Sequence, residues 1–297
     1  MATEPVVHDM LEEEIHGLDA LDALDARIAE ARGGSIPSRI WSAVWPKLMA
    51  LVAVLGVWQL IVWSRWKPPY VISPPKEALS DLWAIAQTAR FRHAFVTTMA
   101  RGFIGFAVAV AIGTALGVVV AQSSIVRRAF GSFLAGLQSM PSIVWFPFAI
   151  IVFKLSESAI LFVVVLGAAP SIANGLVSGI DQIPPLLVRA GRVMGAKGLG
   201  AYRHVVLPAA LPTYVAGLKQ GWAFAWRSLM AGELIVTIAN RTALGAEMHN
   251  AQDLSDMRAV IAYMIVVLFI GIAVDGLIFG SIEKRLLRRR GLFQADA

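Results

Sequence analysis

The chain has 297 residues, of which 57% are hydrophobic and 15% are charged, with a formal net charge of +6. Soluble domains contain about 25% charged residues, so this composition excludes an ordinary soluble globule and predicts a membrane protein with several spans. The chain contains no cysteine, which excludes a disulfide framework and a thiolate metal site. The five histidines are scattered without metal-ligand spacing, so no metal site is predicted. Membrane topology explains the basic excess better than nucleic-acid binding does.

Residues 1–43 are predicted to form an acidic cytoplasmic extension ahead of the first apolar segment. The repeat LDALDALDA at 18–26 has a period of three, which drifts around a helix and gives no narrow apolar stripe. We interpret the extension as a solvated, partly helical tail, with a docking arm for a cytoplasmic partner as the alternative. Its acidic character also argues against a cleaved signal peptide, which begins with basic residues.

Six apolar segments follow, and each is long enough to cross a hydrocarbon core of about 30 Å. They lie at residues 44–63, 98–121, 129–153, 159–180, 213–239 and 259–282. The sequence therefore predicts an all-α membrane domain at 44–283, followed by a basic cytoplasmic tail at 284–297. Tryptophans at both ends of the first segment are interpreted as interface anchors: Trp41, Trp45, Trp63 and Trp66.

The loop at 64–97 and the second segment each carry a further structural expectation. In the loop at 64–97, Leu79, Leu82 and Trp83 share a helix face, which predicts a helix on the membrane surface, with Ser73 as its cap. Gly113 and Gly117 form a GxxxG pair, interpreted as packing within one subunit.

The third segment contains Pro141 and Pro147, and proline kinks or breaks a helix. At membrane depth such a break is tolerated where protein or water satisfies the freed backbone groups. The residues Ser139, Met140, Pro141 and Ser142 are therefore a candidate pathway lining or hinge. A kinked packing helix is the alternative.

Charged residues inside the membrane are the default functional candidates. The last two segments contain four of them: Lys219, Arg227, Glu233 and Asp275. Arg227 and Glu233 are placed near the middle of the fifth segment, six residues apart, so they do not stack on one helix face. Arg227, with Trp222 and Trp226 nearby, is a candidate for attracting an anion. A buried structural ion pair is the alternative.

Between the fourth and fifth segments lies a basic, glycine-rich stretch at 186–212, LLVRAGRVMGAKGLGAYRHVVLPAALP. It carries Arg189, Arg192, Lys197 and Arg203 with no acidic residue between them. The glycines predict a short helix at 186–194, a turn at Gly195 and a second short helix that ends near Val205. Such a turn often needs the left-handed backbone that glycine adopts cheaply.

This stretch resembles the cytoplasmic EAA loop of permease subunits in bacterial ABC importers, in the nitrate, sulfonate and taurine branch. The family pattern is Glu-Ala-Ala, three residues, Gly, nine residues, Ile, one residue, Leu-Pro. Here nine residues separate Gly195 from Val205, and Leu207 and Pro208 follow at the expected spacing. The triplet departs from the pattern, because Arg189-Ala190-Gly191 stands in place of Glu-Ala-Ala. The resemblance implies an ATPase-coupling loop at 186–208 with these contact residues: Arg189, Ala190, Gly195, Ala196, Leu207 and Pro208.

The resemblance also implies a type I ABC importer permease fold with six transmembrane helices. It implies a permease homodimer in the bacterial plasma (inner) membrane, an ABC ATPase dimer below it and a substrate-binding protein outside. Alternating access would move a small anionic solute, such as a sulfonate, nitrate or taurine. Basic residues are more numerous on the side that holds both termini, which favours cytoplasmic termini.

No Walker A motif or hydrolase motif is present in the sequence. ATP and Mg are therefore expected on the partner ATPase, with no cofactor on this chain, and the chain is not expected to be an enzyme. The alternative function is an ATP-independent secondary carrier or channel, whose intramembrane charges would couple to protons or sodium. A carrier has no need of the spacing between Gly195 and Leu207-Pro208, which favours the importer. A membrane-bound enzyme is disfavoured by the missing motifs.

Overall fold

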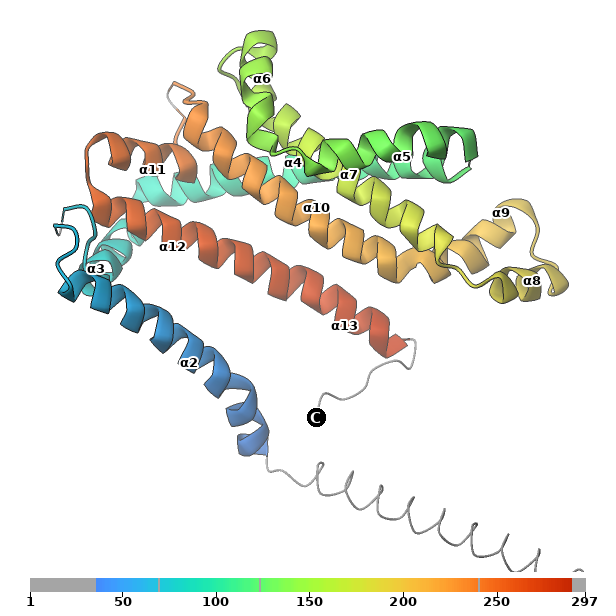
Figure 1. The fold of residues 1–297 in the computed structure, drawn as a ribbon, viewed down its shortest axis with the longest axis horizontal. Helices are drawn as coiled ribbons and strands as arrows, with labels where there is room; N and C mark the ends of the chain where they lie inside the picture. Colours follow the sequence, from blue (N-terminus) through green and yellow to red (C-terminus); the bar gives the residue numbers. More distant parts are fainter. Residues whose placement is uncertain (1–35, 69, 123, 240, 290–297) are drawn as a thin grey trace, which may run out of the picture. The chain divides into compact units, whose positions relative to one another are not determined.

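The computed structural model describes residues 36–289, apart from 69, 123 and 240. Every regular element in this part of the chain is helical (Figure 1). The chain divides into two compact units, the first ending at Ser64 and the second running from Arg65 to Phe293. Most of the predicted acidic extension, and the end of the predicted basic tail, lie outside the described residues.

The first unit is described as one helix, α2 (Ile36–Trp63). Its stretch Val44–Trp63 is long and apolar enough to cross a membrane, as the sequence predicts for 44–63. Trp41 and Trp45 lie near its start and Trp63 is its last residue, so tryptophans occupy both ends of the apolar stretch. This placement fits the predicted role of interface anchors.

Three long helices form the core of the second unit: α4 (Ala89–Gln122), α7 (Glu157–Asp181) and α10 (Leu207–Ile235). Helix α7 packs against both α4 and α10 (Figure 1). A Cβ atom on Gly113 of α4 would lie 2.6 Å from the carbonyl oxygen of Ala169 on α7. A Cβ atom on Gly175 of α7 would lie 2.5 Å from the Cα of Gly217 on α10. The glycines therefore allow close backbone approach within one chain, which confirms the packing role predicted for the GxxxG pair.

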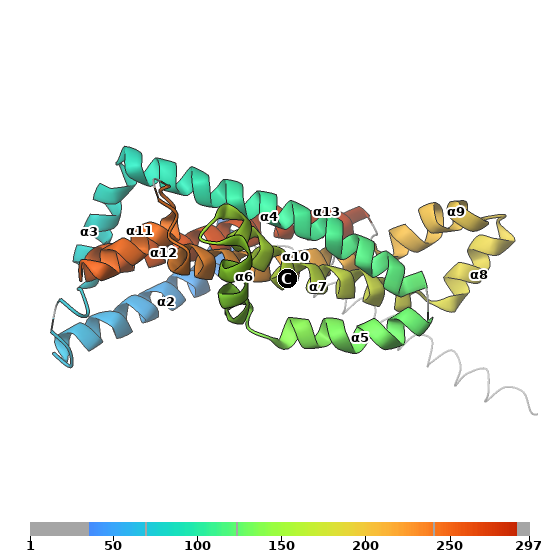
Figure 2. The same ribbon diagram turned by 90° about the horizontal axis from the view of Figure 1, so that it is seen from above.

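The last span is formed by α12 (Met257–Val274), the π-helix η3 (Asp275–Phe279) and α13 (Gly280–Arg289). Two shorter helices, α3 (Pro75–Ala86) and α11 (Leu244–Asp253), lie at the end of this unit opposite α8 and α9 (Figures 1 and 2). The loop helix expected after residue 64 is thus confirmed as α3. Its cap position is occupied by Pro74 and not by Ser73.

The third predicted span is broken. Helix α5 (Ser124–Ser139) ends before Pro141, and the 3₁₀ helix η1 (Ser142–Trp145) and α6 (Phe146–Phe153) continue after a bend of 98°. Proline has no backbone N–H and disfavours helical geometry in the residue before it, so α5 cannot continue through Met140 and Pro141. Pro147 lies in the first turn of α6, where no hydrogen bond is lost.

Apolar length alone does not reproduce the predicted count of six spans. In the described residues four helices meet that criterion, and the bent pair would make a fifth. Helix α10 is 29 residues long but does not qualify. It carries Lys219, Arg227 and Glu233, which reduce its hydropathy, and it is covered by other helices of the chain along much of its length.

Candidate functional site

The basic loop (residues 186–208) begins in α8 (Pro185–Val193), turns, and returns through α9 (Gly198–Ala201) and the π-helix η2 (Tyr202–Val206). The first helix and the turn are as predicted, and Gly195 has a φ of +88°. The predicted end of the second helix near Val205 is wrong, because η2 leads directly into α10. Pro208 is the second residue of α10, directly after the wide π turn, so the helix passes through the proline position without a break.

The two arms of the basic loop are packed against each other. A Cβ atom on Gly191 would lie 2.7 Å from Cγ2 of Val205, so only glycine allows this contact without a shift. The backbone N–H of Ala196 also donates to the Gly191 carbonyl oxygen over 2.9 Å. The arms are therefore positioned as one unit that continues into α10.

The predicted coupling residues lie along this unit. Arg189, Ala190, Gly195, Leu207 and Pro208 are exposed, and Ala196 is half-buried. A hollow of about 430 Å³ lies between the arms and is lined in part by Arg192, Lys197 and Tyr202. The loop thus presents an accessible, positively charged surface.

The break after α5 meets both central helices near Gly167 of α7. A Cβ atom there would lie 3.5 Å from Cβ of Ser142 and 2.6 Å from Oγ of Ser228 on α10. Ser139, Met140 and Pro141 are exposed beside it, and Ser142 is half-buried. The predicted hinge or lining residues therefore lie next to α10 at Ser228, the residue that follows Arg227 in the sequence.

Arg227 is exposed and forms no ion pair with any of the described residues. Its Nε donates to the Ala223 carbonyl oxygen over 3.0 Å, and its guanidinium carbon lies 4.6 Å from the Phe224 ring centroid. A buried structural ion pair at Arg227 is therefore excluded within the described part of the chain. The guanidinium is left accessible for a ligand.

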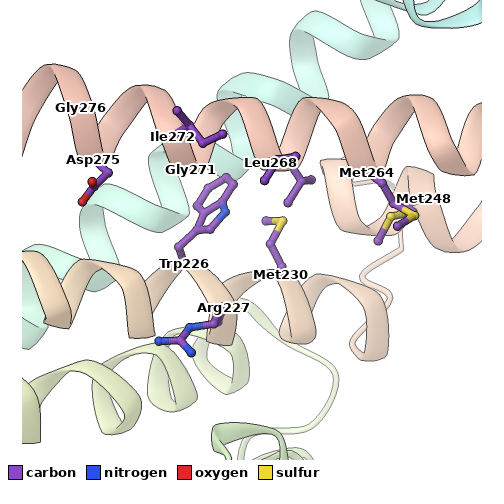
Figure 3. A pocket seen from close by; sticks show the side chains of 11 residues that line it. Trp226, Arg227, Met230, Met248, Met264, Leu268, Gly271, Ile272, Asp275 and Gly276 are labelled. Carbon is purple, nitrogen blue, oxygen red and sulfur yellow. The ribbon is translucent and has the colours of Figure 1, made fainter. Parts of the chain in front are cut away.

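Of the two tryptophans predicted to accompany Arg227, one lines the same cleft and the other is buried. Trp222 is buried and stacks on Phe103 and Trp226, with ring centroids 5.3 and 6.2 Å apart. Trp226 and Arg227 both line a cleft of about 700 Å³ beside α10 and α12, although the guanidinium is turned away from the Trp226 ring (Figure 3). Arg227 therefore shares a cleft with Trp226, whereas Trp222 is used in packing.

Glu233 lies near the end of α10, at the side of α11, and not near the middle of a span as predicted. Its side chain is fully buried. Oε1 accepts from Nη1 of Arg101 over 3.0 Å, while Oε2 is 2.8 Å from the Thr98 hydroxyl and accepts from the backbone N–H of Gly245 over 3.0 Å. Arg101 also makes two bonds of 2.6 Å to Glu157 at the start of α7. This cluster joins α4, α7, α10 and α11, and we call it the four-helix clasp (Thr98, Arg101, Glu157, Glu233 and the Gly245 backbone).

Sequence reasoning missed Thr98, Arg101 and Glu157 as partners of Glu233. Arg101 falls inside the predicted span 98–121, and an arginine in an apolar segment is the signal that identifies such a position. Of the other intramembrane charges, Lys219 pairs with Asp275, with Nζ 3.4 Å from Oδ2, and also lies 3.9 Å from Glu283. Lys219 and Asp275 are therefore used in contacts between α10 and the last span.

The described part of the chain is a helical bundle with an exposed basic loop that is continuous with a central helix. The solved MetNI methionine ABC transporter has the same fold, with a TM-score of 0.56 and 21% identity. The match covers 66% of this chain and 96% of that chain.

Residues 110–287 match the family of the binding-protein-dependent transport system inner membrane component, and the chain belongs to this family. It is therefore an ABC importer permease, a transport subunit and not an enzyme.

Three relatives illustrate the family. An ABC transporter permease protein of Methanocaldococcus jannaschii is 29% identical, over 77% of this chain and 85% of its own length. The taurine transport system permease protein of Escherichia coli is 24% identical, over 82% and 89%. The nitrate import permease protein of Leptolyngbya laminosa is 23% identical, over 82% and 87%.

Proposed function

We propose that this permease moves a small anionic solute of the sulfonate, nitrate or taurine type into the cell, driven by a separate ATPase. Two of its relatives are named for taurine, which carries a sulfonate group, and for nitrate. The observation that carries the coupling mechanism is the continuity of the basic loop with α10 through η2. A loop that is packed internally and fused to a central helix passes its displacement directly into the membrane.

In this proposal the basic loop docks on an ABC ATPase dimer, which holds ATP and Mg, and the permease itself is a homodimer. Closure of the ATPase changes the free energy of its contact with the loop. A partner can shift the permease from one conformation to the other only if its contact energy differs between those two conformations. The loop and both termini face the cytoplasm. The end of the bundle that holds α3 and α11 then faces the substrate-binding protein outside.

The solute pathway is proposed to run past Arg227 and the break at Ser139 to Ser142. An accessible guanidinium inside the membrane offers an anion a partner at a depth where the anion has lost most of its water. The exposed backbone turn at the break supplies further polar groups, which membranes tolerate where a pathway or protein covers them. Arg227 is therefore the residue we expect to attract the solute.

Affinity purification of this chain from its native membrane, with mass spectrometry of the proteins that accompany it, tests the proposal. We expect an ATPase subunit in near-equal amount and ATP-dependent uptake of an anion after reconstitution. A chain that is recovered alone and still moves solute in ATP-free vesicles would instead be an ATP-independent secondary carrier or channel. Sulfonate, nitrate and taurine uptake measured in the same vesicles would then distinguish the substrates.

A further inference from the structure

A short chain of side-chain hydrogen bonds joins α5 to α7. Nδ2 of Asn174 donates to Oε1 of Gln138 over 2.8 Å, and Nε2 of Gln138 donates to Oγ of Ser171 over 2.9 Å. Asn174 and Ser171 belong to α7, which is long and apolar enough to cross a membrane, and Gln138 is the last residue but one of α5. We call this group the amide seam (Gln138, Ser171, Asn174).

The amide seam interrupts a contact that is otherwise apolar. One turn earlier on α5, Leu134 shares a buried apolar cluster with Ala173 of α7. Gln138 is four residues after Leu134 and so lies on the same face of α5. An apolar side chain would fill this position without the cost of burying an amide. Hydrogen bonds between membrane helices add little stability on average, so the amides are expected to do more than hold α5 on α7.

Both amides have a hydrogen-bond donor to spare. A side-chain amide has two N–H donors, and Gln138 and Asn174 each use one of them in the seam. The second makes no hydrogen bond within the described part of the chain. Both amide side chains are half-buried, whereas Ser171 is buried. A donor left unsatisfied against lipid is costly, so the spare donors are expected to face a polar space and not hydrocarbon.

The amide seam adjoins the break in the third span. Gln138 directly precedes Ser139, where the break begins. On α7, Ser171 lies one turn after Gly167, which is the position that contacts both the break and α10 next to Arg227. The seam extends about 10 Å along α7 from Gly167 towards the basic loop, at 1.5 Å per residue. The spare donors therefore lie beside the solute pathway proposed above, on its cytoplasmic side.

We propose that Gln138 and Asn174 bind the oxygen atoms of an oxyanion in transit, at a second position that follows Arg227 on the way to the cytoplasm. This inference rests on the proposed function and narrows the solute to an anion with several acceptor oxygens, such as a sulfonate or nitrate. Neutral donors suit a second position, because each site on a pathway must bind well enough for entry and weakly enough for release. A second cation would hold the anion more tightly, since hydrogen bonds between ionised groups are about twice as strong.

The first test measures ATP-driven uptake of methanesulfonate, nitrate and taurine by the complete importer in vesicles. Asn174→Leu replaces the amide by an apolar group of similar shape and should lower uptake of the transported anion by about tenfold, the effect of one lost hydrogen bond to a charged group. Asn174→Gln keeps an NH₂ group and should restore part of the uptake. Tyr214→Phe is the matched control, because it removes a bond of 2.6 Å between α10 and Thr114 of α4, outside the seam. It should transport as the wild type does, and the yield of folded Asn174→Leu should fall no further than its own.

The second test asks whether an anion reaches the seam. The chain has no cysteine, so Asn174→Cys provides a single thiol. A methanethiosulfonate reagent that carries a sulfonate group should label this thiol, and an excess of methanesulfonate, nitrate or taurine should slow the labelling. The neighbouring Ala173 is fully buried, so Ala173→Cys is the matched control and should stay unlabelled.

The outcomes separate this inference from the proposed function. If the wild-type complex shows no ATP-driven anion uptake, the proposed function fails and the inference fails with it. If uptake is present, but Asn174→Leu matches Tyr214→Phe and Asn174→Cys stays unlabelled, the importer stands and the amide seam is a structural contact only. Reduced uptake by Asn174→Leu, with labelling of Asn174→Cys and not of Ala173→Cys, would support the second binding position.

Discussion

Substitution of Glu233 by alanine should strongly destabilise the permease. In the four-helix clasp its carboxylate accepts from Thr98, Arg101 and the Gly245 backbone, and it is fully buried. Removal of one member of a buried ion pair costs about 3–5 kcal/mol where it leaves an uncompensated charge, but here Arg101 keeps its two bonds to Glu157. The Thr98 hydroxyl and the Gly245 N–H lose their acceptor, so the loss should lie at the lower end of this range, about 3 kcal/mol. Glu233→Gln keeps the shape of the side chain and should cost less.

Reversible unfolding in mixed micelles, titrated with SDS, measures this difference in the free energy of unfolding. Glu283→Gln is the matched control, because Glu283 is 56% exposed and its carboxylate is 3.9 Å from Lys219. A surface pair of this kind contributes about 1 kcal/mol or less. Equal, small losses for Glu233→Ala and Glu283→Gln would refute the reasoning, since they would show that water reaches the clasp.

Three further substitutions test other parts of the structure. Gly195→Val forces a β-branched residue to a φ of +88°, so ATP hydrolysis should continue while transport falls; wild-type transport would count against a coupling role. Gly113→Ala brings a Cβ to within 2.6 Å of a carbonyl oxygen of α7 and should reduce the yield of folded protein, whereas Gly136→Ala, with nothing within 4 Å, should not; equal yields would contradict the packing. Arg227→Ala should lower anion uptake in vesicles more than it lowers assembly, and a parallel fall in both would assign Arg227 a structural role.

Four of the predicted spans and the first arm of the basic loop could be predicted because each depends on local chemistry. Apolar length specifies a membrane helix, and the turn at Gly195 requires a residue that tolerates a positive φ. The course of the second arm could not be predicted in the same way. Pro208 suggests that a helix ends, but the π turn η2 leads directly into α10 and the helix continues past it.

The partners of the buried charges depend on contacts between distant residues. Glu233 stands out in the sequence as an intramembrane carboxylate, but its partner Arg101 is 132 residues away. Similarly, nothing near Trp222 in the sequence indicates that its ring packs on Phe103 of α4. Both outcomes depend on how α10 is rotated against its neighbours, and the contact of Gly175 with Gly217 brings α10 close to α7.

Helices α7 and α10 are joined along their whole length, and this has a mechanical consequence. At one end, both helices lead into the basic loop. At the other end, Arg101 pairs with Glu157 of α7 and with Glu233 of α10. Between these points the two backbones are in contact at Gly175 and Gly217. We therefore expect α7 and α10 to move as one body. A Cβ atom on Gly167 would lie 3.7 Å from Cβ of Ser228, which suits a disulfide between cysteines at these positions. The doubly substituted permease should transport equally well oxidised and reduced, with each single substitution as control; loss on oxidation, reversed by reductant, would show that the helices must slide.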